Sequence, residues 1–207
     1  MNELQEKAWI DAARDGDPLA FEQLIHLYEK RVFALTRRMC KNPADAEEAA
    51  QETFLAAWQG LKFFRGESSF STWLYRLASN ACVDLLRKEG RHQAAAGPSL
   101  NDEEVLLEIQ DEAPSPHALA EQAELKEQIE AGLASLPEEY REVLILREIH
   151  QQSYDEIAEI LSLDLGTVKS RINRGRKRLR KFLLESGNFS VIDSSKESGK
   201  EGCNEIL

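Results

Sequence analysis

The sequence lacks a long hydrophobic run, which excludes a transmembrane helix. Its longest unbroken apolar stretch is residues 54–58, far short of the roughly 20 residues that cross a bilayer. The first residues, MNELQEKAWIDAARDGD, carry acidic side chains throughout and no apolar block before a cleavage-like site. They therefore do not resemble a secretory signal. We expect a cytoplasmic protein with no membrane insertion.

Cysteine is also scarce. The three cysteines, Cys40, Cys82 and Cys203, are far apart and form no CxxC pair, so neither a disulfide framework nor a zinc site is expected. Cys40 and Cys82 are interpreted as small core residues rather than redox sensors. The four histidines form no cluster and no catalytic constellation appears. We therefore expect no metal, no cofactor and no enzymatic activity.

Charge of one sign is missing from two segments. The whole chain has 26 Lys and Arg against 37 Asp and Glu, a net charge of −11. Residues 101–124 hold eight acidic side chains and no Lys or Arg, whereas residues 165–184 hold eight basic side chains and no acid. The basic segment could bind phosphate and the acidic one could occupy a basic channel, although either could be only a solvated face.

No tract shows the sustained two-residue alternation of a β-strand, so the sequence predicts an all-α protein. One amphipathic helix begins after Asp17, and Asn42 followed by Pro43 ends it and starts the next. Loop residues 62–69 lead to a further helix. The apolar residues expected on the buried side of that helix are Trp73, Leu74, Leu77, Ala78, Ala81, Leu85 and Leu86.

Two small helical domains are expected, joined by a flexible acidic linker. Residues 1–92 form the first, and residues 93–118, rich in Gly, Pro, Ser and acid, form the linker. Residues 119–186 form the second domain, and residues 187–207 are predicted to be a disordered tail.

The helix after Asn42 has two unlike faces. At 100° per residue its apolar side chains, including Ala46, Phe54 and Trp58, fall opposite the acids. Most charged helix faces are merely solvated. Leu55, however, lies beside these acids, and an exposed leucine among carboxylates is typical of a docking patch for a basic partner.

Aromatic and basic residues lie close together in the loop at 62–69 and in the helix that follows. Aromatic planes stack on unpaired bases while cations hold the backbone, which is how single-stranded nucleic acid is commonly bound. Phe70 and Trp73 are interpreted as core residues at least as readily as base contacts. The aromatic members of this set are Phe63, Phe64, Phe70, Trp73 and Tyr75.

The C-terminal unit predicts a helix-turn-helix. Pro137 opens one helix, Ser153 and Glu156 form a capping box for a second, and a short break leads to a strongly basic third. Ser162 stands in the turn where glycine is common, so a positive φ there would be slightly strained. The side chains expected to point into a major groove are Lys169, Ser170, Asn173, Arg174 and Lys177.

Four stretches together resemble a known family. They are DAEEAAQETFLAAW (45–58), FRGESSFSTWLYRLASNACVDLLRKE (64–89), LPEEYREVLILREI (136–149) and YDEIAEILSLDLGTVKSRINRGRKRLRK (154–181). In this order they are similar to the signature regions of bacterial RNA polymerase sigma factors of the extracytoplasmic-function type. The resemblance implies a sigma-2 and a sigma-4 domain, which bind core polymerase and promoter DNA and aid promoter melting.

The resemblance also implies three sets of site residues. Docking on the clamp helices of the largest polymerase subunit is assigned to Asp45, Glu48, Gln51, Glu52 and Leu55. Recognition of the minus-10 element is assigned to Phe64, Arg65, Ser68, Ser69, Arg76, Asn80, Asp84, Arg87 and Lys88. Recognition of the minus-35 element as duplex is assigned to Thr167, Lys169, Ser170, Arg171, Asn173, Arg174 and Lys177.

Other partners and two rival functions follow. The resemblance implies contact with the flap of the second-largest polymerase subunit and control by an anti-sigma factor. An acidic linker tethered between two DNA-facing domains can lie in the positively charged nucleic-acid channel of the polymerase until RNA displaces it. One rival is a stand-alone helix-turn-helix regulator, which would have no use for an acidic docking face. The other is a sequestered protein whose visible function is complex formation.

Overall fold

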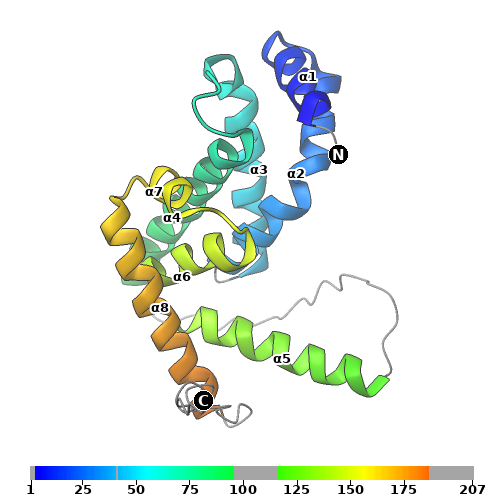
Figure 1. Ribbon diagram of the computed structural model, residues 1–207. Helices are drawn as coiled ribbons and strands as arrows, with labels where there is room; N and C mark the ends of the chain where they lie inside the picture. The colour runs from blue at the N-terminus through cyan, green and yellow to red at the C-terminus, as the bar shows by residue number, and fades with distance from the viewer. Residues whose placement is uncertain (1–2, 41, 96–115, 187–207) are drawn as a thin grey trace, which may run out of the picture.

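The computed structural model describes residues 3–40, 42–95 and 116–186, and the regular elements of these ranges are all helical (Figure 1). The predicted all-α class is therefore confirmed. The elements are α1 (Glu3–Arg14), α2 (Pro18–Met39), α3 (Pro43–Gly60), the 3-10 turn η1 (Leu61–Phe63), α4 (Phe70–Ala95), α5 (Pro116–Ala134), α6 (Glu138–Leu144), the π-helical turn η2 (Ile145–Ile149), α7 (Tyr154–Leu161) and α8 (Leu165–Glu185).

Local capping explains where several helices begin. The Asp17 carboxylate accepts from the Leu19 amide at 2.9 Å at the start of α2, because the first amides of a helix have no partner within it. Asn42 caps α3 in the same way, with Pro43 at the first helical position. The predicted capping box of α7 is confirmed, with Ser153 and Glu156 each accepting from the other's amide.

The first half of the fold, α1 to α4, packs around α2. The apolar stripe of α2 is buried at Leu24, Val32 and Leu35, and α2 contacts α1, α3 and α4. The Tyr28 hydroxyl donates to Glu6 at 2.7 Å and ties α1 to α2. Below the loop at 64–69, the Phe70 and Trp73 rings lie 5.6 Å apart in the core.

The second half, α5 to α8, holds the predicted helix-turn-helix. Val168 and Ile172 are buried on the inner side of α8. Gly175 allows α8 to approach α6 closely, because a Cβ atom there would lie 3.0 Å from Leu144 Cδ1. Arg176 donates to the Glu148 carboxylate at 2.6 Å and fastens α8 to η2.

The two halves pack directly against each other along a surface that we call the seam, where α7, η2 and α5 meet α4 and α2. Figure 1 shows α7 lying beside α4. The buried Thr72 hydroxyl donates to Glu156 at 3.4 Å, and Arg38 lies 3.4 Å from Glu130. Buried residues of both halves form one continuous apolar core. The sequence predicted two helical domains joined by a linker, and it did not predict this contact between them.

Several features of the structure differ from the sequence predictions. Trp58 keeps 39% of its surface exposed, although the helical wheel placed it on the buried side. Tyr75, expected among the base-stacking aromatics, is buried at the seam. Helix α4 continues to Ala95, past the predicted boundary at residue 92. Most of the predicted linker, at 96–115, and the predicted tail lie outside the described residues. No described helix is long and apolar enough to cross a membrane.

Candidate polymerase-docking and nucleic-acid-binding surfaces

The acidic side of α3 forms an exposed strip, which we call the docking face: Asp45, Glu48, Gln51, Glu52 and Leu55. All except Asp45 are exposed, and Leu55 keeps 53% of its surface exposed. Ala46, Ala49 and Thr53 bury the opposite side of α3. Asp45 is half-buried, and its carboxylate accepts from the Asn42 amide group at 2.7 Å, so this residue also serves the helix cap.

Apolar surface extends the docking face toward the end of α3. Trp58 lies one turn beyond Leu55, and its ring packs 5.0 Å from that of Phe21 on α2. This contact fixes the indole at the surface even though it is partly exposed. An exposed leucine and tryptophan beside three carboxyl groups combine an apolar anchor with charge, which is the composition of a protein interface for a basic partner.

The loop at 64–69 presents few free side chains. Arg65 is exposed, whereas Phe64 is half-buried against Trp73, with ring centroids 5.1 Å apart. The Ser69 hydroxyl accepts from the Thr72 amide at 3.0 Å and caps α4. Gly66 has φ +71, a conformation that glycine adopts without steric cost. The loop therefore combines an exposed cation with a Ser69 side chain engaged in the cap.

The remaining residues assigned to the minus-10 element form a row along one side of α4, which we call the minus-10 row: Arg76, Asn80, Asp84, Arg87 and Lys88. Their spacing of about one helical turn places them on one side of the helix. Asn80, Asp84, Arg87 and Lys88 are exposed and Arg76 is half-buried. Asp84 and Arg87 form an ion pair at 3.7 Å, so part of the positive charge is compensated.

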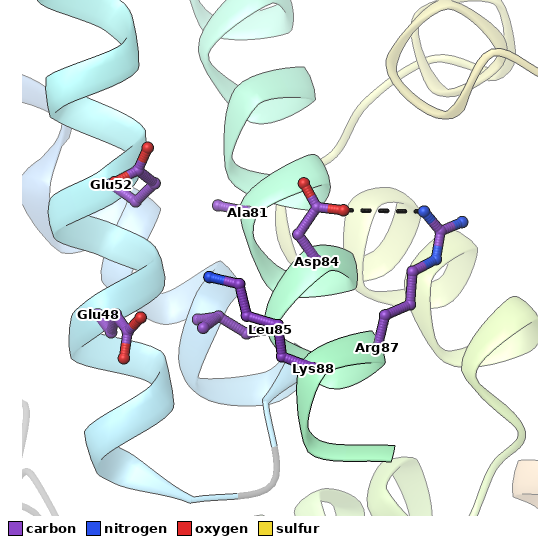
Figure 2. A pocket seen from close by; sticks show the side chains of 7 residues that line it. All are labelled: Glu48, Glu52, Ala81, Asp84, Leu85, Arg87 and Lys88. Carbon is purple, nitrogen blue, oxygen red and sulfur yellow. Dashed lines mark ion pairs between the residues drawn. The ribbon is translucent and has the colours of Figure 1, made fainter. Parts of the chain in front are cut away.

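A groove joins the docking face to the minus-10 row, as Figure 2 shows. It has a volume of about 640 Å³ between α3 and α4. Glu48 and Glu52 of α3 form one wall, and Ala81, Leu85 and Lys88 of α4 lie across from them, with the Lys88 side chain extending toward α3. Asp84 and Arg87 line the side of the groove farther from α3. The two surfaces predicted for different partners are therefore adjacent.

Helix α8 carries the third predicted set. The side chains expected to face a major groove are all exposed and define the minus-35 row: Lys169, Ser170, Asn173, Arg174 and Lys177. Thr167 is half-buried, and its hydroxyl donates to Asp164, which also accepts the Thr167 amide at 2.8 Å. The start of α8 is thereby rigidly capped.

Arg171 departs from the minus-35 row. Its guanidinium turns toward α6 and lies 3.3 Å from the Glu139 carboxylate, with 25% of the side chain exposed. Glu142 of α6 also lies in the field of Arg171. Burial, together with neighbouring Glu138, raises the pKa of Glu142 to about 7. Arg171 therefore pairs with α6 of its own fold, while the five residues of the minus-35 row remain exposed.

Sequence patterns did not reveal the polar groups at the seam. Burial, with the charges of Arg38 and Arg31, lowers the pKa of His150 to about 4, so the ring is neutral at pH 7. Its ring centroid lies 4.9 Å from that of Tyr75. Within the described part of the chain, His150 Nε2 has no hydrogen-bond partner. Within the same part, no group of His, Cys, Asp and Glu could hold a metal ion.

Comparison with known proteins identifies both halves. Residues 24–92 match Sigma-70 region 2, and residues 126–179 match Sigma-70, region 4. The chain is 35% identical over 185 residues to the extracytoplasmic-function RNA polymerase sigma factor SigW of Bacillus subtilis, covering 88% of this chain and 99% of SigW. It is 34% identical to the sigma-E factor of Haemophilus influenzae, covering 86% of this chain and 94% of that relative.

Solved structures show the same fold. The sigma factor RpoE of Bartonella quintana, solved with the anti-sigma factor NepR, aligns with a TM-score of 0.66 at 24% identity, over 79% of this chain and 96% of RpoE. CnrH, solved with the cytosolic domain of CnrY, aligns with a TM-score of 0.63 at 26% identity, over 88% of this chain and 99% of CnrH. With two matched sigma-70 regions and near full-length relatives, the chain belongs to the extracytoplasmic-function family of RNA polymerase sigma factors.

Proposed function

We propose that this chain binds core RNA polymerase through the docking face and directs it to promoters with two spaced elements. One observation supports the proposal: the same chain has two exposed surfaces of opposite charge. These are the acidic docking face of α3, with its exposed leucine, and the basic minus-35 row of α8. The two faces suit partners of opposite charge, because the first attracts a basic protein surface and the second attracts phosphate. A stand-alone DNA-binding regulator needs only the second.

The exposed residues suggest how the work is divided. The minus-35 row would enter a major groove, where Arg174 can read guanine and Asn173 can read adenine. The minus-10 row, with Arg65, would hold opened single-stranded DNA. Phe70 and Trp73 are core residues in the structure, so we do not assign base stacking to them.

Promoter melting in this proposal uses binding energy. Unpaired bases held on the protein offset the cost of unstacking them, so no nucleophile, metal or cofactor is invoked. With a net charge of −11 the free chain should bind DNA poorly, and promoter affinity should arise in the complex with polymerase.

The proposal also covers the cellular location of the chain and its regulation. The chain would work in the bacterial cytoplasm, with core polymerase and promoter DNA. An anti-sigma factor is the further partner we propose, because the relative RpoE is solved with the anti-sigma factor NepR. Such a partner would hold the chain at the membrane.

The decisive experiment is transcription in vitro with purified core polymerase and a genomic DNA library, with and without the chain. New RNA start sites that share two spaced upstream motifs are the expected result. If no new starts appear while the chain alone binds a specific duplex, the proposal is wrong and the chain is a stand-alone regulator.

Charge reversal tests the docking face. Glu48→Lys combined with Glu52→Lys should abolish binding to core polymerase, because repulsion replaces attraction at a basic surface. Glu22→Lys with Glu29→Lys on α2 is the matched control, since it changes the net charge equally at exposed positions outside the docking face. Equal core affinity for both double variants would refute the assignment.

A single truncation tests the minus-35 row. Arg174→Ala should weaken promoter binding by the holoenzyme by about 10- to 100-fold, because one base contact contributes about 1–3 kcal/mol of discrimination. Arg180→Ala, exposed further along α8, is the matched control. Core binding should stay unchanged in both variants, and its loss with Arg174→Ala would refute the division of labour.

A further inference from the structure

Lys88 belongs to two surfaces at once. It is an exposed member of the minus-10 row on α4, and it also lines the groove between α3 and α4. Figure 2 shows its side chain extending toward α3, where Glu48 and Glu52 of the docking face form the facing wall. One cation of the predicted DNA surface therefore lies in the field of two carboxylates of the predicted polymerase surface.

The groove has the composition of a receptor for a long cationic side chain. Glu48 and Glu52 are four positions apart on α3, so their carboxylates lie on the same side of the helix. Ala81 and Leu85 of α4 supply apolar surface across from them. The methylene groups of a Lys or Arg side chain pack on apolar surface of this kind, while the charged end stays beside carboxylates and water.

The charges on the far side of the groove compensate each other. Asp84 and Arg87 form an ion pair at 3.7 Å on the side farther from α3. The remaining cation among the lining residues is Lys88, and it faces α3. Lys88 is exposed, so its ammonium group keeps contact with water and can leave the groove without unfolding any part of the chain.

We propose that the groove receives a Lys or Arg side chain of core polymerase, and that Lys88 occupies the same two carboxylates until this partner displaces it. The inference rests on the proposed function, because it identifies how the docking face takes up its basic partner. Once displaced, the Lys88 ammonium group becomes available to DNA phosphate along the minus-10 row. Core binding therefore strengthens DNA binding, and by linkage DNA strengthens core binding by the same factor.

The expected coupling is modest, because the three charged side chains are exposed. An attraction between exposed opposite charges changes an affinity by about 2- to 5-fold. Salt screens such charges, so the effect should be present at about 0.1 M salt and absent at about 1 M.

The first experiment measures the affinity of the full chain for purified core polymerase by fluorescence anisotropy. Lys88→Met should tighten core binding by about 2- to 5-fold, because it removes the internal competitor for Glu48 and Glu52. Lys30→Met, at an exposed position of α2 outside the docking face and both DNA rows, is the matched control for the loss of one positive charge. Equal affinities of the two variants, or weaker core binding by Lys88→Met, would overturn the proposal.

A double-mutant cycle identifies the carboxylates that Lys88 occupies. In the Glu48→Gln and Glu52→Gln background, Lys88→Met should no longer tighten core binding, because there is no charge left to compete for. Tightening that persists in this background would show that Lys88 acts elsewhere.

A DNA measurement tests the displacement itself. The probe is a single-stranded oligonucleotide carrying the minus-10 sequence that the library transcription identifies. Lys88→Met should weaken its binding by about 2- to 5-fold more in the complex with core polymerase than in the free chain. Equal losses in the two states would overturn the displacement. If the parent chain does not bind core polymerase, the proposed function fails; if it binds and Lys88→Met behaves as Lys30→Met does, this inference alone fails.

Discussion

Glu142 should make the stability of the fold depend on pH. Burial raises its pKa in the folded chain from 4.5 to about 7. The folded chain therefore holds this proton more tightly than the unfolded chain does. The protonated Glu142 carboxyl makes its full contribution to the free energy of unfolding below about pH 4.5. This contribution is lost as the pH rises through about 7. Glu142→Gln removes the charge at every pH while it keeps the shape of the side chain.

The size of the effect follows from the shift. Each pKa unit corresponds to about 1.4 kcal/mol, and Glu142 keeps some contact with water, so we expect Glu142→Gln to stabilise the fold by about 2 kcal/mol at pH 8. At pH 4.5 and below the substitution should have almost no effect, because the parent carboxyl is then protonated. Urea unfolding followed by circular dichroism at both pH values measures the difference.

A matched substitution isolates the buried charge. Glu159→Gln changes an exposed carboxyl in the same half of the fold, and its effect on the free energy of unfolding should be near zero at both pH values. If Glu142→Gln changes stability equally at pH 4.5 and pH 8, the carboxyl is not held uncharged by burial and the reasoning about α6 is refuted.

Three further substitutions test other features. Ser162→Gly should raise the free energy of unfolding by about 1 kcal/mol in urea titrations, because Ser162 has φ 52 and glycine adopts that backbone freely; a loss of stability would contradict this. Gly175→Ala should lower the free energy of unfolding by about 2 kcal/mol in the same titrations, because the added Cβ would lie 3.0 Å from Leu144 Cδ1. An increase, as helix propensity alone would give, would show that the neighbouring side chain moves aside. Thr72→Val should speed hydrogen exchange in α7 about tenfold, as the seam loses a bond to Glu156, whereas unchanged exchange would mean that this bond contributes nothing.

Local patterns predicted much of the fold. The caps at Asp17, Asn42 and Ser153 depend on residues three or fewer positions away, so the sequence alone identifies them. The exposure of Leu55 also follows from helical periodicity. Such features need no knowledge of which helices meet.

Features that depend on distant helices were missed. Trp58 is held at the surface by Phe21, and Arg171 is turned inward by Glu139, which no spacing along one helix reveals. The seam, where Thr72 meets Glu156 across 84 positions, has no sequence signal at all. Packing between elements, rather than the helices themselves, limited the prediction of the candidate site.

The seam also has a thermal consequence. The two halves share one continuous apolar core, and the seam also buries Tyr75 beside the neutral ring of His150. Parting the two halves would wet this apolar surface, and hydration of apolar groups raises the heat capacity. The attraction that keeps the halves together therefore weakens on cooling. A drop in temperature alone would favour the open arrangement, with no change in partner, ligand or covalent structure.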